Sequence, residues 1–419
     1  MATTGLVQLE VLAIFVTVFA LIVLRRVGRF KIEIWLAMLL GAILFLTLGI
    51  VSLGDAFRLI NMNILAFLFG TFAMVEVMAQ TGLLQYLAIR FLRTAKTPAR
   101  LLLITLIFVG FASAFLVNDA VVLVMTPIAI SACAFSKVRT VPYLLAVALA
   151  SNIGSALTPI GNPQNILIKI ASSTDTIYWF SRMALPTVLG ICSAYFILRW
   201  VYRKDVGGSF SGELPEPGTM LTNRTGAIAI GVIAVATVLG FLTSDLTGVP
   251  IAMVALAGGF AALLISSERG KAVKEIDWGT LIFFAAMFIV MGTVASSGLL
   301  DYLFAPFTGT LFASGSSSVL SIFGMSLLVS QVTSNVPFVA IALPIFLNAK
   351  AGSAKWLSLA AGSTLAGNAT LLGAAANIIV LEAAERRGSS FSYAEFLKAG
   401  IPVALATSAI TAIFLILTA

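Results

Sequence analysis

Runs of about twenty apolar residues recur along almost the whole chain, and they constrain the fold more than any other feature. A helix needs a run of this length to cross the hydrocarbon core of a membrane. Eight runs are uninterrupted: 6–24, 32–53, 60–79, 182–203, 225–243, 249–267, 277–296 and 398–418. Because lipid cannot satisfy backbone polar groups, the sequence predicts an all-α polytopic membrane protein.

The composition excludes the main soluble classes of protein. Of the 419 residues, 60% are hydrophobic and 10% are charged, whereas soluble domains carry roughly 25% charged residues. The net charge of +8 is therefore assigned to positive-inside loops and anionic lipid headgroups, not to nucleic acid. The chain has no His, and Cys133 and Cys192 lie in apolar runs, so no metal or other cofactor is expected. Nothing in the sequence indicates an enzyme active site.

Four further apolar segments are interrupted by polar residues. Residues 98–137 and 314–350 have apolar arms around a polar centre, and we expect each to be a re-entrant hairpin. Residues 141–172 and 354–386 contain Gly, Pro and Asn, and we expect each to be a broken helix. Irregular backbone at membrane depth is tolerated only inside protein or beside a cavity, so function is expected in these segments.

This division predicts ten transmembrane helices, and the basic residues then give their orientation. With ten crossings, most of the 25 Lys and Arg residues fall on one side, which the positive-inside rule makes cytoplasmic. Both termini are then extracytoplasmic, in the cell (inner) membrane. The first residues carry no basic segment, so residues 6–24 are interpreted as a retained helix and not as a signal peptide.

The two halves of the chain resemble each other. GLLQYL at 82–87 matches GLLDYL at 298–303, and other matches follow in the same order at offsets of 212 to 217 residues. Each half has five crossings, an odd number, so the second repeat is predicted to be inverted, as in many secondary transporters. Short amphipathic helices are expected at 82–93 and 298–308. The predicted parts are 1–31 and 32–203 (repeat 1), a cytoplasmic linker at 204–224, and 225–419 (repeat 2).

Polar clusters in the four interrupted segments form the predicted site. Asp119, at the first hairpin tip, is the predicted proton-coupling residue, because a carboxylate at membrane depth is costly and is therefore by default a functional-site hypothesis. Its equivalent in the second half is Val336. Lys169 is expected to reach the outer interface. The predicted substrate-binding residues are Asn118, Ser151, Asn152, Thr158, Asn162, Asn165, Ser334, Asn335, Asn368, Thr370 and Asn377. The alternative is that these small polar residues serve only helix packing.

These clusters resemble the ion transporter superfamily, which includes ArsB-type arsenite permeases, divalent-anion/sodium symporters, citrate carriers and sodium/proton antiporters. The resemblance rests on TPIGNPQN at 158–165 and TSN at 333–335, and it covers about residues 30–418. NDA at 118–120 and MTP at 125–127 are most similar to the arsenite-permease and anion-permease branch. The resemblance implies a scaffold domain and a transport domain that carries both hairpins.

The predicted clusters contain no basic residue, which favours a small neutral solute over an anion. We therefore expect proton-coupled efflux of arsenite and antimonite by alternating access. Alternatives are a Na⁺- or H⁺-coupled permease for an oxyanion or small carboxylate, and a Na⁺/H⁺ antiporter. The expected partners are a small inorganic solute and membrane lipid, and not nucleic acid. A separate cytoplasmic ATPase and a homodimer remain open, and the chain itself has no P-loop.

Overall fold

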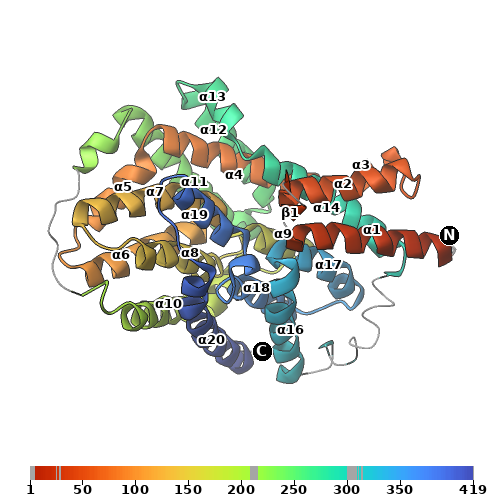
Figure 1. Ribbon diagram of the computed structural model, residues 1–419. Coiled ribbons are helices and arrows are strands. Elements are labelled where there is room, and N and C mark those ends of the chain that lie inside the picture. The colour runs from red at the N-terminus through yellow and green to blue at the C-terminus, as the bar shows by residue number, and fades with distance from the viewer. Residues whose placement is uncertain are drawn as a thin grey trace.

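The computed structural model describes residues 5–24, 26–27, 30–207, 216–299, 309, 311–312 and 315–418. These residues are almost entirely helical (Figure 1), and the prediction of a multi-pass helical membrane protein is confirmed. Within the described ranges, eight helices are long and apolar enough to cross a membrane. They are α4 (Met62–Gln80), α6 (Pro98–Phe115), α7 (Asn118–Ser136), α10 (Thr176–Val201), α11 (Arg224–Thr247), α14 (Trp278–Ser296), α16 (Ser316–Thr333) and α20 (Tyr393–Thr418).

Further helices belong to the fold. They include α1 (Gly5–Leu24), which has 20 residues, and the shorter α2 (Ile34–Thr47), α5 (Leu83–Leu92), α8 (Val141–Ser155), α12 (Ile251–Ile265), α17 (Asn335–Asn348) and α18 (Ser353–Ala366). The predicted amphipathic helix at 82–93 corresponds to α5, whereas its partner at 298–308 lies almost wholly outside the described residues. The arms α6, α7 and α16 are each long enough to cross alone, so the count of ten crossings stays a prediction.

Both predicted hairpins consist of two helices with a very short connection. Helices α6 and α7 are joined by residues 116–117, and α16 and α17 are joined by Ser334 alone. Ser334 has φ 65° and ψ 165°, a backbone conformation that residues other than glycine rarely adopt. The turn between α16 and α17 is therefore strained at a single residue.

Both predicted broken helices are interrupted at their polar clusters. The first consists of α8 and α9 (Pro163–Ser172), and the second of α18, η2 (Leu371–Gly373) and α19 (Ala375–Glu385). Asn162 caps α9 by accepting from the backbone N–H of Asn165 at 2.9 Å, and Pro163 occupies the first turn. A capping Asn followed by Pro is a strong signal for a new helix start.

Several element boundaries differ from the predictions. The run 32–53 is not one helix, because α2 ends at Thr47 and α3 (Leu53–Leu59) begins separately after Ser52, whose side chain caps it. Helices α10 and α20 begin before the predicted 182 and 398, at capping or polar residues that apolar runs do not show. The sequence also did not predict α13 (Arg269–Glu275), η1 (Pro217–Met220), or the two-residue strands β1 (Arg26–Val27) and β2 (Phe30–Lys31), which pair antiparallel.

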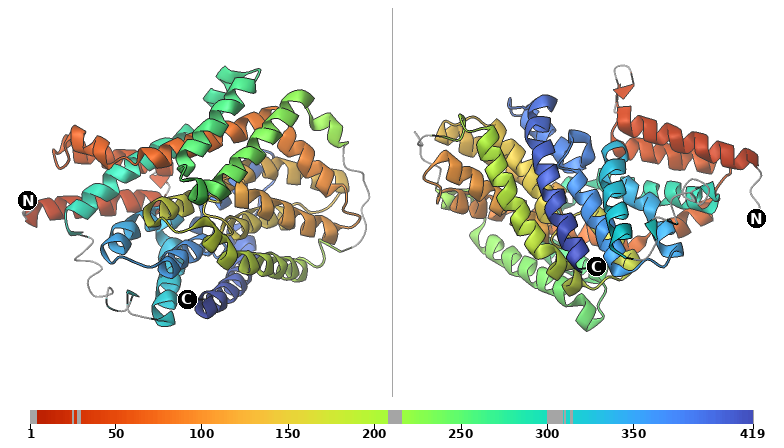
Figure 2. Two further views of the ribbon diagram at one scale, coloured as in Figure 1. Left: turned by 180° about the vertical axis from the view of Figure 1, so that it is seen from behind. Right: turned by 90° about the horizontal axis from the view of Figure 1, so that it is seen from below.

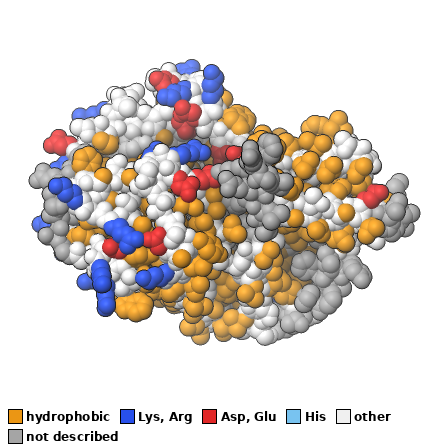
Figure 3. All heavy atoms as spheres, viewed as in Figure 1, with side chains coloured by type: hydrophobic (Ala, Val, Ile, Leu, Met, Phe, Trp, Pro, Cys, Tyr) orange, Lys and Arg blue, Asp and Glu red, His pale blue; other side chains and the backbone are white. Residues whose placement is uncertain are grey.

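The helices pack mainly in two groups. One group contains α1, α2, α4, α11, α12 and α14, and the other contains both helix pairs, both broken helices, α10 and α20. The two groups meet where α14 contacts α17 and where α4 contacts α9. Helices α10 and α20 lie side by side (Figure 2). A methyl group on Gly154 of α8 would overlap the Gly110 carbonyl of α6, so glycine permits this close crossing. In the view of Figure 3, charged side chains gather at the top, around α13, and many hydrophobic side chains lie at the lower centre.

Candidate functional site

A cavity of about 1060 Å³ lies where the helix pairs and the broken helices meet. Its lining includes Asp119 and Ala120 of α7, Ser334 and Asn335 of the second tip, Pro163 at the start of α9 and Ala375 at the start of α19. The ends of four separate segments therefore converge on one space, as the sequence predicts for its four clusters.

Among the residues that the structure describes, the cavity lining is mainly acidic. These described lining residues include one basic side chain, Arg386, so the expectation of a site without any fixed cation does not hold for the whole cavity. The acidic lining residues are Glu33, Glu76, Asp119, Glu275, Asp277, Glu382 and Glu385. A space walled by one sign of charge attracts ions of the opposite sign and disfavours ions of the same sign. The chemistry of this lining favours cations and neutral solutes over anions.

Asp119 lies in the first turn of α7. Its backbone N–H donates to Asn118 Oδ1 at 3.0 Å, and the Asn118 N–H donates to the Gly161 carbonyl at 2.9 Å. The first tip is therefore attached to the break between α8 and α9. Within the described part of the chain, the Asp119 carboxylate accepts no hydrogen bond, which leaves it available to a proton or another cation in the cavity.

Amide side chains hold each break together. Asn165 Nδ2 donates to the Ser155 and Thr158 carbonyls at 3.0 and 3.3 Å. In the second break, Asn377 Nδ2 donates to the Gly367 and Thr370 carbonyls at 2.7 and 3.1 Å. These bonds satisfy carbonyls that the helix interruption leaves without intrahelical partners.

The two breaks are also bonded to each other across the protein. Asn152 Nδ2 donates to Asn377 Oδ1 at 3.1 Å, and Thr364 Oγ1 donates to Asn165 Oδ1 at 3.2 Å. Asn162 Nδ2 also donates to Thr364 Oγ1, at 3.0 Å. The centre of the molecule is therefore one buried polar network that joins both halves.

Each break is further attached to the neighbouring helix pair. Thr158 Oγ1 donates to the Ala114 carbonyl of α6. Thr370 Oγ1 donates to Gln331 Oε1 of α16 at 2.8 Å, and Gln331 Nε2 donates to the Ala366 carbonyl at 2.8 Å. Each pair of helices is thus fixed to its broken helix by hydrogen bonds close to the cavity.

The predicted site residues fall into two sets. Asp119, Ser334 and Asn335 line the cavity. The other predicted residues do not line it, and they are Asn118, Ser151, Asn152, Thr158, Asn162, Asn165, Asn368, Thr370 and Asn377. Most of this second set serves the network above, whereas Ser151 Oγ donates only within its own helix, to the Ala148 carbonyl. Asn368 is fully buried, and no described residue partners its side-chain amide.

Sequence reasoning did not predict six of the lining acids as site residues, because acids at span ends and in loops were given no role. These acids are Glu33, Glu76, Glu275, Asp277, Glu382 and Glu385. The signal available for them was their position. All lie at ends of apolar runs that the predicted topology places on the cytoplasmic side, where the loops come together.

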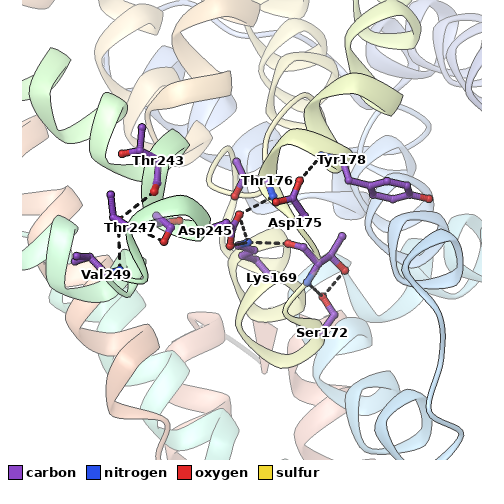
Figure 4. Close-up of polar contacts among 11 residues, drawn as sticks. Lys169, Ser172, Asp175, Thr176, Tyr178, Thr243, Asp245, Thr247 and Val249 are labelled. Atoms are coloured by element: carbon purple, nitrogen blue, oxygen red, sulfur yellow. Dashed lines mark hydrogen bonds and ion pairs between the residues drawn. The ribbon is translucent and has the colours of Figure 1, made fainter.

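Lys169 does not extend its ammonium group into solvent, as a lysine reaching the outer interface would, but pairs with a carboxylate. Its side chain is 6% exposed, and Nζ lies 2.7 and 2.8 Å from the two carboxylate oxygens of Asp245 (Figure 4). Nζ also donates to the Thr174 carbonyl at 2.7 Å. A buried charge needs a charged partner, and Asp245 on α11 supplies it. The sequence signal that could have indicated this ion pair was the presence of Lys169 and Asp245 at the ends of two separate apolar runs.

Solved structures support the overall fold. The chain is similar to the YdaH transporter of Alcanivorax borkumensis, with a TM-score of 0.59, 16% identity and 98% of each chain covered. It is also similar to MtrF of Neisseria gonorrhoeae, with a TM-score of 0.55, 14% identity, and coverage of 97% of this chain and 94% of the other. At these identities the likeness concerns the fold alone.

Several sequence relatives are named as transporters or membrane proteins. The chain is 28% identical to a 46 kDa membrane protein of Mycobacterium leprae, covering 96% of this chain and 97% of the relative. It is 26% identical to the silicon efflux transporter LSI3 of Oryza sativa subsp. japonica, covering 83% and 84% respectively. The profile of the CitMHS citrate transporter family matches residues 19–362, which is most of the chain, and this membrane transporter therefore belongs to that family.

Proposed function

We propose that this transporter exports small neutral trihydroxy metalloids, arsenite and antimonite, in exchange for protons. The observation that carries the proposal is the acidic cavity, which has the carboxylate of Asp119 and the polar tip residues Ser334 and Asn335 in its wall. Such a cavity suits a coupling cation together with an uncharged solute that hydroxyl and amide groups can bind.

The charge of the lining decides between classes of substrate. An anion such as citrate would enter among seven carboxyl side chains, with Arg386 as the one basic group in the described lining. A neutral hydroxylated solute meets no such repulsion. The similarity to a silicon efflux transporter adds support, because silicic acid is also a small hydroxylated solute that is neutral near pH 7.

Asp119 is the proposed coupling residue. It lines the cavity, and its equivalent position in the second half, Val336, also lines the cavity but cannot titrate. One titratable tip is consistent with one coupling ion for each cycle. A proton is the proposed ion, and Na⁺ is the alternative.

A cation-coupled carboxylate or oxyanion permease is the second candidate. The family description, citrate transporter, and the presence of Arg386 in the cavity wall favour it. A Na⁺/H⁺ antiporter that uses Asp119 alone is a third candidate, and it needs no solute site.

We further propose ten crossings arranged as two inverted repeats, with α6–α7 and α16–α17 as re-entrant hairpins and both termini outside the cytoplasm. Two observations support this arrangement. The basic residues fall mainly on one side under this count. The hydrogen bonds of Asn165 and Asn377 are equivalent, with donors and acceptors separated by the same 212 positions.

Transport in everted membrane vesicles tests the function. The host strain should lack its own arsenite exporter, and a proton gradient should be imposed with the inside acidic. The proposal expects arsenite accumulation that stops when an ionophore collapses the gradient. Accumulation of citrate instead, with arsenite excluded, would establish the second candidate.

A further inference from the structure

The Lys169–Asp245 ion pair connects the two groups of helices (Figure 4). Lys169 belongs to α9, in the group that carries the polar breaks, and Asp245 belongs to α11, in the other group. Asp245 Oδ2 also accepts from the Thr176 backbone N–H at 2.7 Å, at the start of α10. One carboxylate thus binds both the end of α9 and the beginning of α10.

Helix α9 links this ion pair to the cavity. Its first residue, Pro163, lines the cavity, and Lys169 follows six residues later, near the other end of the ten-residue helix. A movement of α9 relative to α11 must therefore change both the cavity wall and the distance between Lys169 and Asp245.

The ion pair lies at the opposite end of α11 from the cavity mouth. Residues just before α11 contact the end of α4, where Thr222 Oγ1 donates to the Gln80 carbonyl at 2.5 Å. Glu76, one turn earlier on α4, lines the cavity. Asp245 lies 21 residues after the first residue of α11, which is about 30 Å along a helix. That distance is close to the thickness of the hydrocarbon core.

Asp245 makes the polar connection between these helices. Throughout the described part of the chain, every side-chain hydrogen bond between α11 and the segment 163–176 ends on this carboxylate. The remaining contacts of α11 are mainly with α12 and α4. The ion pair is therefore positioned to hold the two groups together at this end of the molecule.

Burial makes this contact sensitive to changes in its partners. The Lys169 side chain is 6% exposed and that of Asp245 is 30% exposed. Removal of Asp245 leaves the buried Lys169 ammonium without a charged partner, and removal of Lys169 leaves a carboxylate that is only partly exposed. Each unpaired charge favours a state in which it is more fully hydrated. Removal of both partners leaves no such charge, so the double variant should have a smaller effect than either single variant.

We propose that the Lys169–Asp245 pair is a latch, meaning a contact that stabilises one of the two alternating-access states. While the pair is intact, the cavity is open at the end lined by Asp277. The pair must separate before the cavity can open at the opposite end. The proposal rests on alternating access, which is part of the proposed function, but it does not depend on the identity of the solute. Lys169 and Asp245 act here as positioning residues, since neither lines the cavity.

Cysteine accessibility tests the latch. The reporter is Leu123→Cys, at an exposed position in the cavity wall, in a background with Cys133→Ala and Cys192→Ser. A membrane-impermeant maleimide is added to everted vesicles, and the labelling rate is compared among Lys169→Met, Asp245→Asn and the double variant. Gly270→Cys on α13, where an added Cβ meets no atom, reports correct insertion and orientation.

We expect each single variant to slow labelling of the reporter by about threefold or more, and the double variant to slow it less. Arg139→Gln is the matched control, because it removes a bridge to Asp205 and Glu395 at a half-exposed site away from α11. Its labelling rate should equal that of the parent. The latch is contradicted if the reporter in the single variants is labelled at the same rate as in the parent, or faster.

A variant that fails to insert is recognised by lost labelling of Gly270→Cys. In that case the double variant, which carries neither charge, is used as the test. A labelling rate of its Leu123→Cys reporter equal to that of the parent rejects the proposal. The readout needs no solute. Failed arsenite transport by the parent together with slowed labelling would therefore reject the metalloid assignment and support the latch.

Discussion

Asn165 and Asn377 occupy equivalent places in the two broken helices, 212 positions apart. Each side-chain amide donates to two carbonyls of its own break, and the acceptors, Ser155 with Gly367 and Thr158 with Thr370, are separated by the same 212 positions. Each amide oxygen also accepts a bond from the opposite half, from Thr364 or Asn152. The two interruptions are therefore stabilised by the same device and depend on each other.

We expect Asn165→Ala and Asn377→Ala each to lower the free energy of unfolding by about 1–3 kcal/mol, because buried carbonyls lose their donors. Thermal or denaturant unfolding of the purified protein in detergent measures this loss. Ser151→Ala is the matched control, since that buried hydroxyl bonds only within its own helix, and its effect should be clearly smaller. Equal stability of all three variants would show that the network is not structural.

Asp119→Asn should abolish uphill transport while leaving the protein inserted. Asparagine keeps the shape of the side chain but cannot exchange a proton. The measurement is solute accumulation against a gradient in everted vesicles, alongside counterflow of preloaded solute, which requires no proton. Counterflow should persist. If the variant still accumulates solute in response to a proton gradient, Asp119 is not the coupling residue.

Arg386→Gln separates the neutral-solute and anion hypotheses. Arg386 is the basic group in the described cavity lining, so an anionic substrate would depend on it. For arsenite we expect less than a threefold change in half-saturation, because the solute is neutral. Competition by citrate that is strong in the parent and weak in Arg386→Gln would instead place the substrate among carboxylates.

Gly154→Ala should prevent correct packing of α8 against α6, because the added methyl group would overlap the Gly110 backbone. We expect greatly reduced yield of folded protein, assayed by size-exclusion chromatography in detergent. Gly270→Ala is the control, since nothing lies within 4 Å of its added Cβ. Normal yield from Gly154→Ala would mean that the two helices are not in such close contact.

The proposed orientation predicts that Gly270→Cys is labelled from the cytoplasm and Val249→Cys from outside. Both positions are chosen for access: Gly270 has open space around it, and Val249 is 43% exposed. Impermeant maleimide applied to intact cells and to everted vesicles distinguishes the two sides. Labelling of both positions from one side would require a different number of crossings.

Hydrophobicity and local breaker residues allowed much of the fold to be predicted. Long apolar runs require helices in lipid, so the multi-pass class and the approximate spans followed directly. The interruptions at 156–162 and 367–374 were visible because Gly, Pro and Asn end or restart helices locally. The short helices α3 and α13 were missed because their signal is a cap and a few polar residues, which apolar runs do not reveal.

Side-chain partners were decided only by the tertiary structure. The polar clusters were visible in the sequence, but periodicity could not divide them into Asp119, Ser334 and Asn335 at the cavity and the remaining amides inside the network. The acidic side chains of the described cavity lining come from seven positions spread along the chain. Lys169 likewise pairs with Asp245, which lies 76 positions later in the sequence. Helix starts and lipid-facing length are local properties of the chain, whereas a charge or an amide acquires its role from the segments that folding brings beside it.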